Sequence, residues 1–309
     1  MKLNELTINK AKEGLLKKEF SSTELTVACL EQIKTHDEKL NSFITLCEEK
    51  AIEDAKKADA ILNSETTCLA ARRAEQLNNR PLLGIPIALK DLYLTKGIKT
   101  TAGSKVLGDY IPEYDATVVE KLKNAGAIII GKTNCDAWAH GSSGENSDFG
   151  PTKNPWDLNF VPGGSSSGSA VSVSTDMCLA ASGTDTGGSV RQPASFCNVV
   201  GLKPTYGRVS RYGIVAMASS LDSIGHFTKT VEDCAIYLNV TAGKDKHDAT
   251  TPEIEVPDYT KNLNKGVKGI KIGIPKEYFS DGVDPKIIGI IKEALKKLEM
   301  LGAEIVDIS

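Results

Sequence analysis

Residues 162–194 read PGGSSSGSAVSVSTDMCLAASGTDTGGSVRQPA, and this stretch decides which fold the chain can have. Two clusters of Gly and Ser flank a run of small, largely apolar residues, 170–182. Flexible linkers are also made of Gly and Ser, but a linker would keep its polar composition throughout. Here the small apolar run is suited to close packing, and the second cluster mixes Gly with Asp, Arg and Pro. The pattern therefore indicates a tightly specified backbone.

Two well-known glycine-rich motifs fit this stretch poorly. A phosphate-binding P-loop would end in Lys-Ser or Lys-Thr, and that ending is absent here. The G-x-S-x-G elbow of the α/β-hydrolases has a glycine two residues to each side of its serine. Ser165 lies in GGSSS and Ser189 lies in GGSVR, so neither has that spacing.

A serine nucleophile needs a base, and histidine is the usual one. His36 and His247 lie in polar surroundings typical of a surface, while His140 and His226 lie near Gly-rich turns, where a lone His is more often structural. A Ser-His-Asp triad stays open as an alternative. Lys90 closes the apolar run GIPIALK, where burial would lower its pKa until the neutral amine can act as a base. The competing interpretation is a lysine that extends from the strand end to water.

Composition and charge indicate an ordinary folded protein. The chain has 309 residues, 40% of them hydrophobic, and a formal net charge of −3 without long runs of Lys or Arg, which argues against gripping nucleic acid by charge alone. Its seven cysteines are scattered without CxxC spacing, as is usual in a reducing cytosol. The N-terminus lacks the apolar stretch of a signal peptide, and no segment approaches the length of a membrane span. We expect a soluble, cytoplasmic protein.

The hydrophobic pattern predicts an α/β protein. Residues 3–78 have helical spacing, with Ser21 to Thr23 as candidate caps, a second helix at 48–62, and a tether or surface helix at 64–80. Strand, helix and strand then alternate, and the same order returns near the C-terminus. The strands are expected at 83–89, 127–131, 268–274 and 303–308, and the helices between them at 117–124 and 285–301. Ending on a strand is unusual for such a domain, so we expect a C-terminal part to be missing.

Three segments resemble the three parts of the amidase signature family: GIPIALKD around Lys90, PGGSSSGSA around Ser165 and GTDTGGSVRQPA around Ser189. The resemblance implies a central mixed β-sheet covered by helices on both faces. It also implies a catalytic triad in which Lys90 is the base, Ser165 the proton relay and Ser189 the nucleophile, with a cis peptide bond before Ser165. The backbone N–H groups of the turn would form the oxyanion hole, and that turn consists of Thr186, Gly187, Gly188 and Ser189. No metal or cofactor is expected in this chain. Asp185 and Arg191 bracket the turn and are expected to brace it by hydrogen bonds.

Residues 196–235 closely resemble the amidotransferase branch of that family, whose members release ammonia from glutamine so that Glu-tRNA(Gln) becomes Gln-tRNA(Gln) in translation. This implies a heterotrimer with partner subunits B and C, in which ATP and Mg²⁺ are used by the partner and the tRNA is reached through the complex. The family's C-terminal third is absent here. Thr184 stands where the family more often has Ser, and His140 where it often has Met. A stand-alone amidase of small amides and a non-catalytic scaffold are the alternatives.

The resemblance also suggests a division of the chain. We expect an N-terminal helical region at 1–80, an amidase signature core at 81–243, and the start of a C-terminal part of the same domain at 244–309.

Overall fold

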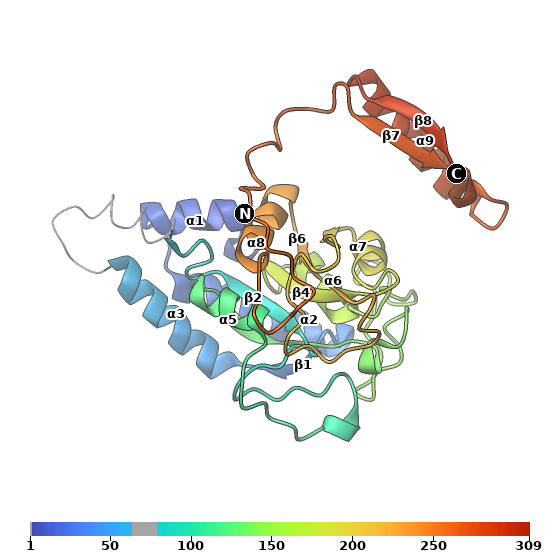
Figure 1. Cartoon of the computed structure of the whole chain (residues 1–309). Coiled ribbons are helices and arrows are strands. Elements are labelled where there is room, and N and C mark those ends of the chain that lie inside the picture. The colour runs from blue at the N-terminus through green and yellow to red at the C-terminus, as the bar shows by residue number, and fades with distance from the viewer. Residues whose placement is uncertain (1, 64–78) are drawn as a thin grey trace. The chain divides into compact units, whose positions relative to one another are not determined.

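The computed structural model describes residues 2–63 and 79–309, and it divides into two compact units (Figure 1). The first unit extends to Tyr259 and the second comprises Thr260–Ser309. The expected tether or surface helix at 64–80 lies, apart from its last two residues, outside the described residues. The domain boundaries inferred from the sequence remain predictions.

A six-stranded mixed sheet forms the centre of the first unit, in the order β1-β3-β2-β4-β6-β5. Strand β2 runs parallel to β3 and β4, whereas the pairs β1·β3, β4·β6 and β5·β6 are antiparallel. The strand bounds are β1 Phe43–Leu46, β2 Pro86–Lys90, β3 Ile128–Thr133, β4 Ala180–Asp185, β5 Val200–Leu202 and β6 Ser223–Thr228. The expected mixed sheet is therefore confirmed.

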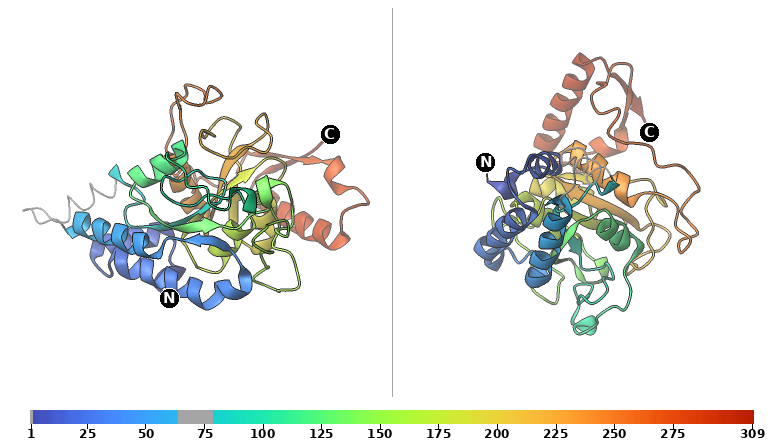
Figure 2. Two further views of the ribbon diagram at one scale, coloured as in Figure 1. Left: turned by 90° about the horizontal axis from the view of Figure 1, so that it is seen from below. Right: turned by 90° about the vertical axis from the view of Figure 1, so that its left-hand side faces the viewer.

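Helices cover both faces of this sheet (Figure 2). Helix α5 connects β2 to β3 and α6 lies between β3 and β4, and these two crossovers run in opposite directions along the sheet. Because such crossovers are right-handed, the two helices lie on opposite faces. Helix α8 packs beside α5, and α7 packs beside α6. The helix bounds are α1 Ile8–Lys17, α2 Ser22–Leu40, α3 Glu48–Asn63, α5 Thr117–Asn124, α6 Ser167–Ser174, α7 Arg191–Cys197 and α8 Val231–Thr241.

Helix α2 shows how the sequence specifies these elements. Ser21, one of the candidate cap residues, accepts a hydrogen bond from the Glu24 N–H, and Glu24 bonds back to the Ser21 N–H to form a capping box. Asn41 ends the helix in the left-handed conformation that Asn tolerates. The buried apolar residues of the helix include the four that the sequence pattern singled out, Leu25, Cys29, Leu30 and Ile33. The helical spacing in the sequence thus predicted the buried face correctly.

Strands β2 and β3 differ from their predicted bounds for identifiable reasons. Strand β2 begins only at Pro86, because residues 81–84 form a turn in which Gly84 has φ 77°. Strand β3 extends beyond the apolar run to Thr133, because Lys132 is buried and paired with Asp91 at 3.3 Å. A polar residue that finds a charged partner can therefore continue a buried strand.

The second unit consists of two parallel strands and one helix. Strands β7, Lys271–Pro275, and β8, Glu304–Ile308, pair along their full length, and α9, Pro285–Met300, lies between them in the chain. Asp284 caps α9 through the Lys286 N–H. The strand, helix and strand expected here are confirmed. Within residues 2–63 and 79–309, no helix is both long and apolar enough to span a membrane.

Candidate active site

Lys90 lies at the end of β2, in the middle of the sheet, and is completely buried. Its side-chain nitrogen, Nζ, is 2.8 Å from Ser165 Oγ and 2.8 Å from Thr184 Oγ1. The side chain therefore does not extend to water. The structure brings together the lysine and the first serine that the sequence predicted, although 75 positions separate them in the chain.

Burial gives this lysine the properties of a base. Desolvation lowers the pKa of Lys90 from 10.5 to about 8, while Cys135, Asp136 and more distant carboxylates act in the opposite direction. A lysine with a pKa near 8 is neutral in an appreciable fraction of molecules at neutral pH. A neutral amine held against a hydroxyl can accept its proton.

Ser165 is also fully buried and follows a cis peptide bond from Gly164, as the resemblance implied. Its carbonyl accepts a hydrogen bond of 3.2 Å from the Asp136 N–H. A Cβ atom at position 164 would lie 2.1 Å from Asp136 Oδ2, so only glycine fits there. Helix α6 begins two residues after Ser165 and fixes the chain on the other side of it.

Ser189 lies in the turn between β4 and α7 and is largely buried, at 8% exposure. Its carbonyl accepts a hydrogen bond of 3.2 Å from the Ser166 N–H, which joins this turn to the Ser165 segment. In the described part of the chain the Ser189 hydroxyl has no hydrogen-bond partner. In particular, no bond joins it to Ser165 Oγ. The hydroxyl is therefore free to turn toward a substrate or toward Ser165.

The turn of residues 186–189 offers backbone donors, but not all of them are available. The Gly188 N–H donates to Asp185 Oδ1 at 2.9 Å. The N–H groups of Thr186, Gly187 and Ser189 have no acceptor among the described residues. A Cβ atom at Gly187 or Gly188 would have no atom within 4 Å, so the space in front of the turn is open. The geometry thus leaves three of the four expected oxyanion donors unoccupied.

Asp185 and Arg191 brace this turn, as expected. The guanidinium of Arg191 donates to both carboxylate oxygens of Asp185, at 3.0 and 2.9 Å. The N–H groups of Val190 and Arg191 donate to the same carboxylate. Burial acts to raise the pKa of Asp185, but these hydrogen bonds prevail and lower it. A permanently ionised carboxylate therefore anchors the end of the turn.

The sequence interpretation missed two polar residues next to the predicted triad. Thr184 stood out only as a departure from the family, yet its hydroxyl is the second partner of Lys90. Asp222, just before β6, accepts a hydrogen bond of 2.6 Å from Thr186 Oγ1. The sequence could have indicated Thr184, because alternate residues of a strand such as β4 face the same side of the sheet. Nothing in the sequence indicated Asp222, because Asp222 reaches this site only through the pairing of β4 with β6.

The histidines do not form a triad with either serine. All four lie in the described part of the chain, and none is hydrogen-bonded to Ser165 or Ser189. His226 is fully buried against the Tyr237 ring, with centroids 4.8 Å apart, and burial lowers its pKa to about 4. His140 is exposed and contacts the Trp138 carbonyl through Nδ1 at 3.0 Å. Among the described residues, no group of three or more His, Cys, Asp or Glu side chains could hold a metal ion.

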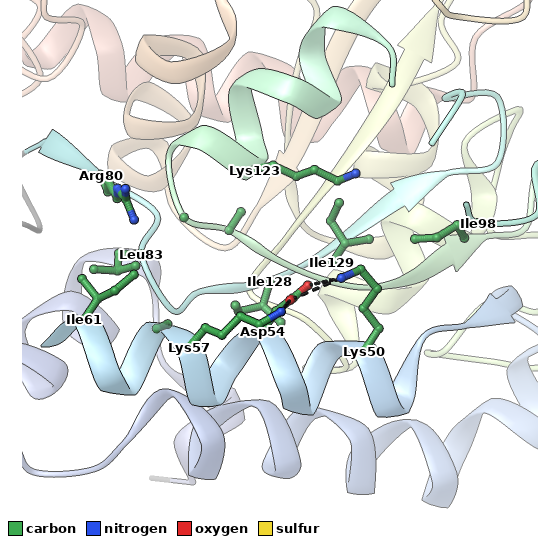
Figure 3. A pocket seen from close by; sticks show the side chains of 13 residues that line it. Lys50, Asp54, Lys57, Ile61, Arg80, Leu83, Ile98, Lys123, Ile128 and Ile129 are labelled. Atoms are coloured by element: carbon green, nitrogen blue, oxygen red, sulfur yellow. Dashed lines mark hydrogen bonds and ion pairs between the residues drawn. The ribbon is translucent and has the colours of Figure 1, made fainter. Parts of the chain in front are cut away.

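A separate pocket of about 330 Å³ lies between α3 and β3 (Figure 3). Isoleucines of β3 form its floor, and Lys50, Lys57 and Lys123 stand at its rim. Each of these lysines is paired with a carboxylate within 3.2 Å. Its lining contains no serine, so it contributes nothing to the chemistry of the Lys90 site.

Comparison with known proteins gives this geometry a context. The chain is 53% identical over its whole length to the A subunit of glutamyl-tRNA(Gln) amidotransferase from Desulfatibacillum aliphaticivorans. It is 52% identical to the corresponding protein of Geobacter metallireducens. In both cases the chain spans 61% of the relative's length.

Comparison with solved structures finds the same kinds of protein. The A subunit of glutamyl-tRNA(Gln) amidotransferase from Thermotoga maritima superposes with a TM-score of 0.85 and 44% identity, over 99% of this chain and 62% of that one. The native peptide amidase from Stenotrophomonas maltophilia superposes with a TM-score of 0.87 and 35% identity, over 99% of this chain and 62% of that one. The family described as Amidase matches residues 24–309. Because this family model matches most of the chain, the chain belongs to the amidase family.

Proposed function

We propose that this protein hydrolyses the side-chain amide of glutamine and supplies the ammonia to a tRNA-dependent amidotransferase. One observation carries the chemical part: a fully buried Lys90 is hydrogen-bonded to Ser165, and the Ser165 segment is joined to the turn that carries Ser189. Identity above 50% to two proteins named as glutamyl-tRNA(Gln) amidotransferase A subunits supports the choice of glutamine.

Attack on the amide begins with a proton transfer through two hydroxyls. Neutral Lys90 accepts the proton of the Ser165 hydroxyl, and Ser165 in turn accepts the proton of Ser189 as Ser189 Oγ bonds to the amide carbon. The 2.8 Å contact between Lys90 and Ser165 already has the length that such a transfer needs. Lys90 ends this step as an ammonium.

The tetrahedral intermediate places a negative charge on the former carbonyl oxygen. Preorganised N–H donors stabilise that charge, and losing one typically costs about 10²–10³ in rate. We assign this role to the N–H groups of Thr186, Gly187 and Ser189. Gly188 belongs to the same turn, but its N–H serves the bond to Asp185 that holds the turn in shape.

Collapse of the intermediate breaks the carbon–nitrogen bond. The ammonium of Lys90 returns its proton through Ser165 to the leaving nitrogen, which departs as ammonia. A glutamyl ester then remains on Ser189. Water attacks this ester with the same relay as base, so that glutamate and the free serine are formed.

The assembly proposed for this activity is a cytoplasmic heterotrimer with partner subunits B and C. In that arrangement the partner uses ATP and Mg²⁺ to activate Glu-tRNA(Gln) and receives the ammonia. The relatives' names support an assembly of this kind, since they describe one subunit of a larger enzyme.

Replacing the nucleophile tests the proposal. We expect Ser189→Ala in the intact protein, assembled with the partner subunits, to reduce ammonia release from glutamine to background. Ser280→Ala, an exposed serine of the second unit, is the matched control and should retain activity. Glutaminase activity of Ser189→Ala equal to that of the unmodified protein would contradict the catalytic assignment.

A stand-alone amidase is the second candidate, because the superposition with a peptide amidase has a TM-score of 0.87. The two functions differ in their dependence on partners. Ammonia release from glutamine that rises when subunits B and C, ATP and Glu-tRNA(Gln) are added supports the amidotransferase. Rapid hydrolysis of peptide amides without partners, together with no response to them, supports the stand-alone enzyme.

A further inference from the structure

The carboxylate of Asp222 is buried, at 6% exposure, and every hydrogen bond it accepts comes from one of two short segments. Oδ1 accepts from the Thr186 hydroxyl at 2.6 Å and from the Ala218 N–H at 3.1 Å. Oδ2 accepts from the N–H groups of Met217 and Ala218, at 2.9 and 3.1 Å. Asp222 therefore ties the turn at 217–222 to the first residue of the turn that carries Ser189.

The turn of residues 186–189 depends on such ties more than most turns do. Its two middle residues are Gly187 and Gly188, which have no side chains to pack and no neighbours within 4 Å of a Cβ position. Glycine also loses more conformational freedom on folding than other residues. The shape of the turn is therefore set by two carboxylates, Asp185 through the Gly188 N–H and Asp222 through Thr186.

We propose that Asp222 is a positioning residue for the oxyanion site: through the Thr186 hydroxyl it orients the backbone N–H groups of Thr186 and Gly187 toward the substrate carbonyl. This inference rests on the proposed function, since it assigns a task to the same turn. A hydrogen bond to an ionised acceptor is shorter and stronger than a neutral one, which suits a group that must hold a flexible backbone.

A carboxylate is needed at position 222 because both of its oxygens accept hydrogen bonds. In Asp222→Asn one side-chain oxygen could still accept from Thr186. The new amide NH₂ would then face the N–H groups of Met217 and Ala218, and donors cannot bond to donors. The 217–222 turn would lose its anchor, and with it the fixed position of Asp222.

Asp222 also acts on the base through its charge. It is one of the carboxylates that counter the burial of Lys90 and raise the pKa of that lysine. Removing the charge should lower the pKa of Lys90, whereas removing the Thr186 hydroxyl should not. The two changes share an effect on the turn and differ in their effect on the base.

The experiment is a double-mutant cycle on glutamine hydrolysis by the assembled enzyme. Thr186→Val removes the hydroxyl but keeps the branched shape and the backbone N–H. We expect Thr186→Val and Asp222→Asn each to lower kcat roughly 10- to 100-fold while KM changes less than about threefold, because misplaced donors weaken transition-state binding. The double variant should lose little more than Asp222→Asn alone, because the Thr186 hydroxyl acts on the turn only through the position of Asp222. Thr186→Ser, which restores a hydroxyl, should recover most of the loss.

A matched control and a pH profile separate positioning from general destabilisation. Thr23→Val breaks a Thr–Asp hydrogen bond of the same length, 2.6 Å to Asp59, at the start of α2, and should leave kcat unchanged. Asp222→Asn should shift the rising limb of kcat/KM to lower pH, and Thr186→Val should not move it.

Multiplicative losses in the double variant, or losses confined to thermal stability, would overturn the inference. If Asp222→Asn does not fold, Thr186→Val alone can still overturn the inference. An unchanged kcat in Thr186→Val would exclude the positioning role. If Ser189→Ala retains activity, the proposed function fails instead, so the two failures are distinguishable.

Discussion

Two fully buried lysines lie on adjacent strands, and their surroundings give them different chemistry. Lys132 of β3 is 3.3 Å from the Asp91 carboxylate and donates to the Tyr93 carbonyl and the Thr100 hydroxyl. Among the described residues, the Nζ of Lys90 in β2 hydrogen-bonds only to hydroxyls, those of Ser165 and Thr184. Burial lowers the pKa of both, but only Lys132 has an adjacent carboxylate to counter it. This difference favours Lys90 over Lys132 as the proposed base.

Substituting these two lysines should separate activity from stability. Lys90→Met should fold and lose roughly 10²–10⁴ in kcat/KM, the usual contribution of a general base. Lys132→Met should lower the free energy of unfolding by about 3–5 kcal/mol, because it leaves Asp91 buried without its cation. Glutaminase assays and chemical denaturation measure the two effects. An active Lys90→Met variant would contradict the assignment of the base.

The lowered pKa of Lys90 predicts how the rate depends on pH. Only the neutral amine can accept the proton, so kcat/KM should rise about tenfold per pH unit below the pKa and level off above about 8. Lys90→Arg should not restore the activity, because a guanidinium stays protonated. A rate that falls as pH rises from 6 to 8 would show that a protonated group is required instead.

At the scale of elements, α6 positions Ser165, the proposed relay, by packing close to its neighbours. A Cβ atom on Gly168, in the first turn of α6, would lie 2.2 Å from the Ser42 carbonyl oxygen and 2.6 Å from the Asn134 nitrogen. Both are backbone atoms, which cannot move aside easily. Ser165 lies three residues before this contact, so the approach of α6 to the sheet sets the depth of its hydroxyl.

Gly168→Ala should therefore disturb both the fold and the site. Overpacking of this kind typically costs about 1–3 kcal/mol, and a displaced Ser165 should lower kcat as well. Gly289→Ala in α9 is the matched control: no atom lies within 4 Å of its Cβ position, so alanine should be neutral or stabilise the helix by up to about 1 kcal/mol. Denaturation and kinetics measure both variants. Equal stability of the two would contradict the close approach of α6.

Some elements of the fold could be predicted from the sequence and others could not. Elements whose signals are local were predicted well, as with α5 at Thr117–Asn124 and α9 after its Asp284 cap. Lys90, Ser165 and Ser189 could be proposed as a triad from the sequence because each lies in a short, distinctive segment. The contacts that join those segments could not be predicted from the sequence. They depend on the sheet order β2-β4-β6, which brings Thr184 and Asp222 to the site. Whether the Gly188 N–H is already hydrogen-bonded likewise depends on tertiary geometry.

At the scale of the whole molecule, the sheet buries one group that couples folding to acid. His226 on β6 is fully buried, and neither ring nitrogen has a hydrogen-bond partner in the described part of the chain. Burial lowers its pKa from 6.5 to about 4, so the unfolded chain binds this proton more readily than the folded protein. Stability from this group is present above pH 6.5 and is lost as the pH falls toward 4.

Replacing His226 should weaken that acid sensitivity. We expect His226→Phe to lose less stability than the unmodified protein between pH 6.5 and 4, by an amount on the order of 3 kcal/mol. His36→Gln, at an exposed position, should keep the original pH dependence. Chemical denaturation at several pH values measures this slope. An unchanged slope in His226→Phe would show that other groups cause the acid sensitivity.

The central claim is that a buried amine, acting through one serine, makes another serine a nucleophile toward glutamine. Trapping tests it most directly: the intact protein is treated with a glutamine-derived electrophile and the modified peptide is identified by mass spectrometry. We predict a single covalent adduct on Ser189, formed much more slowly in Lys90→Met. An adduct on Ser165 or on a cysteine, with Ser189 unmodified, would contradict the account.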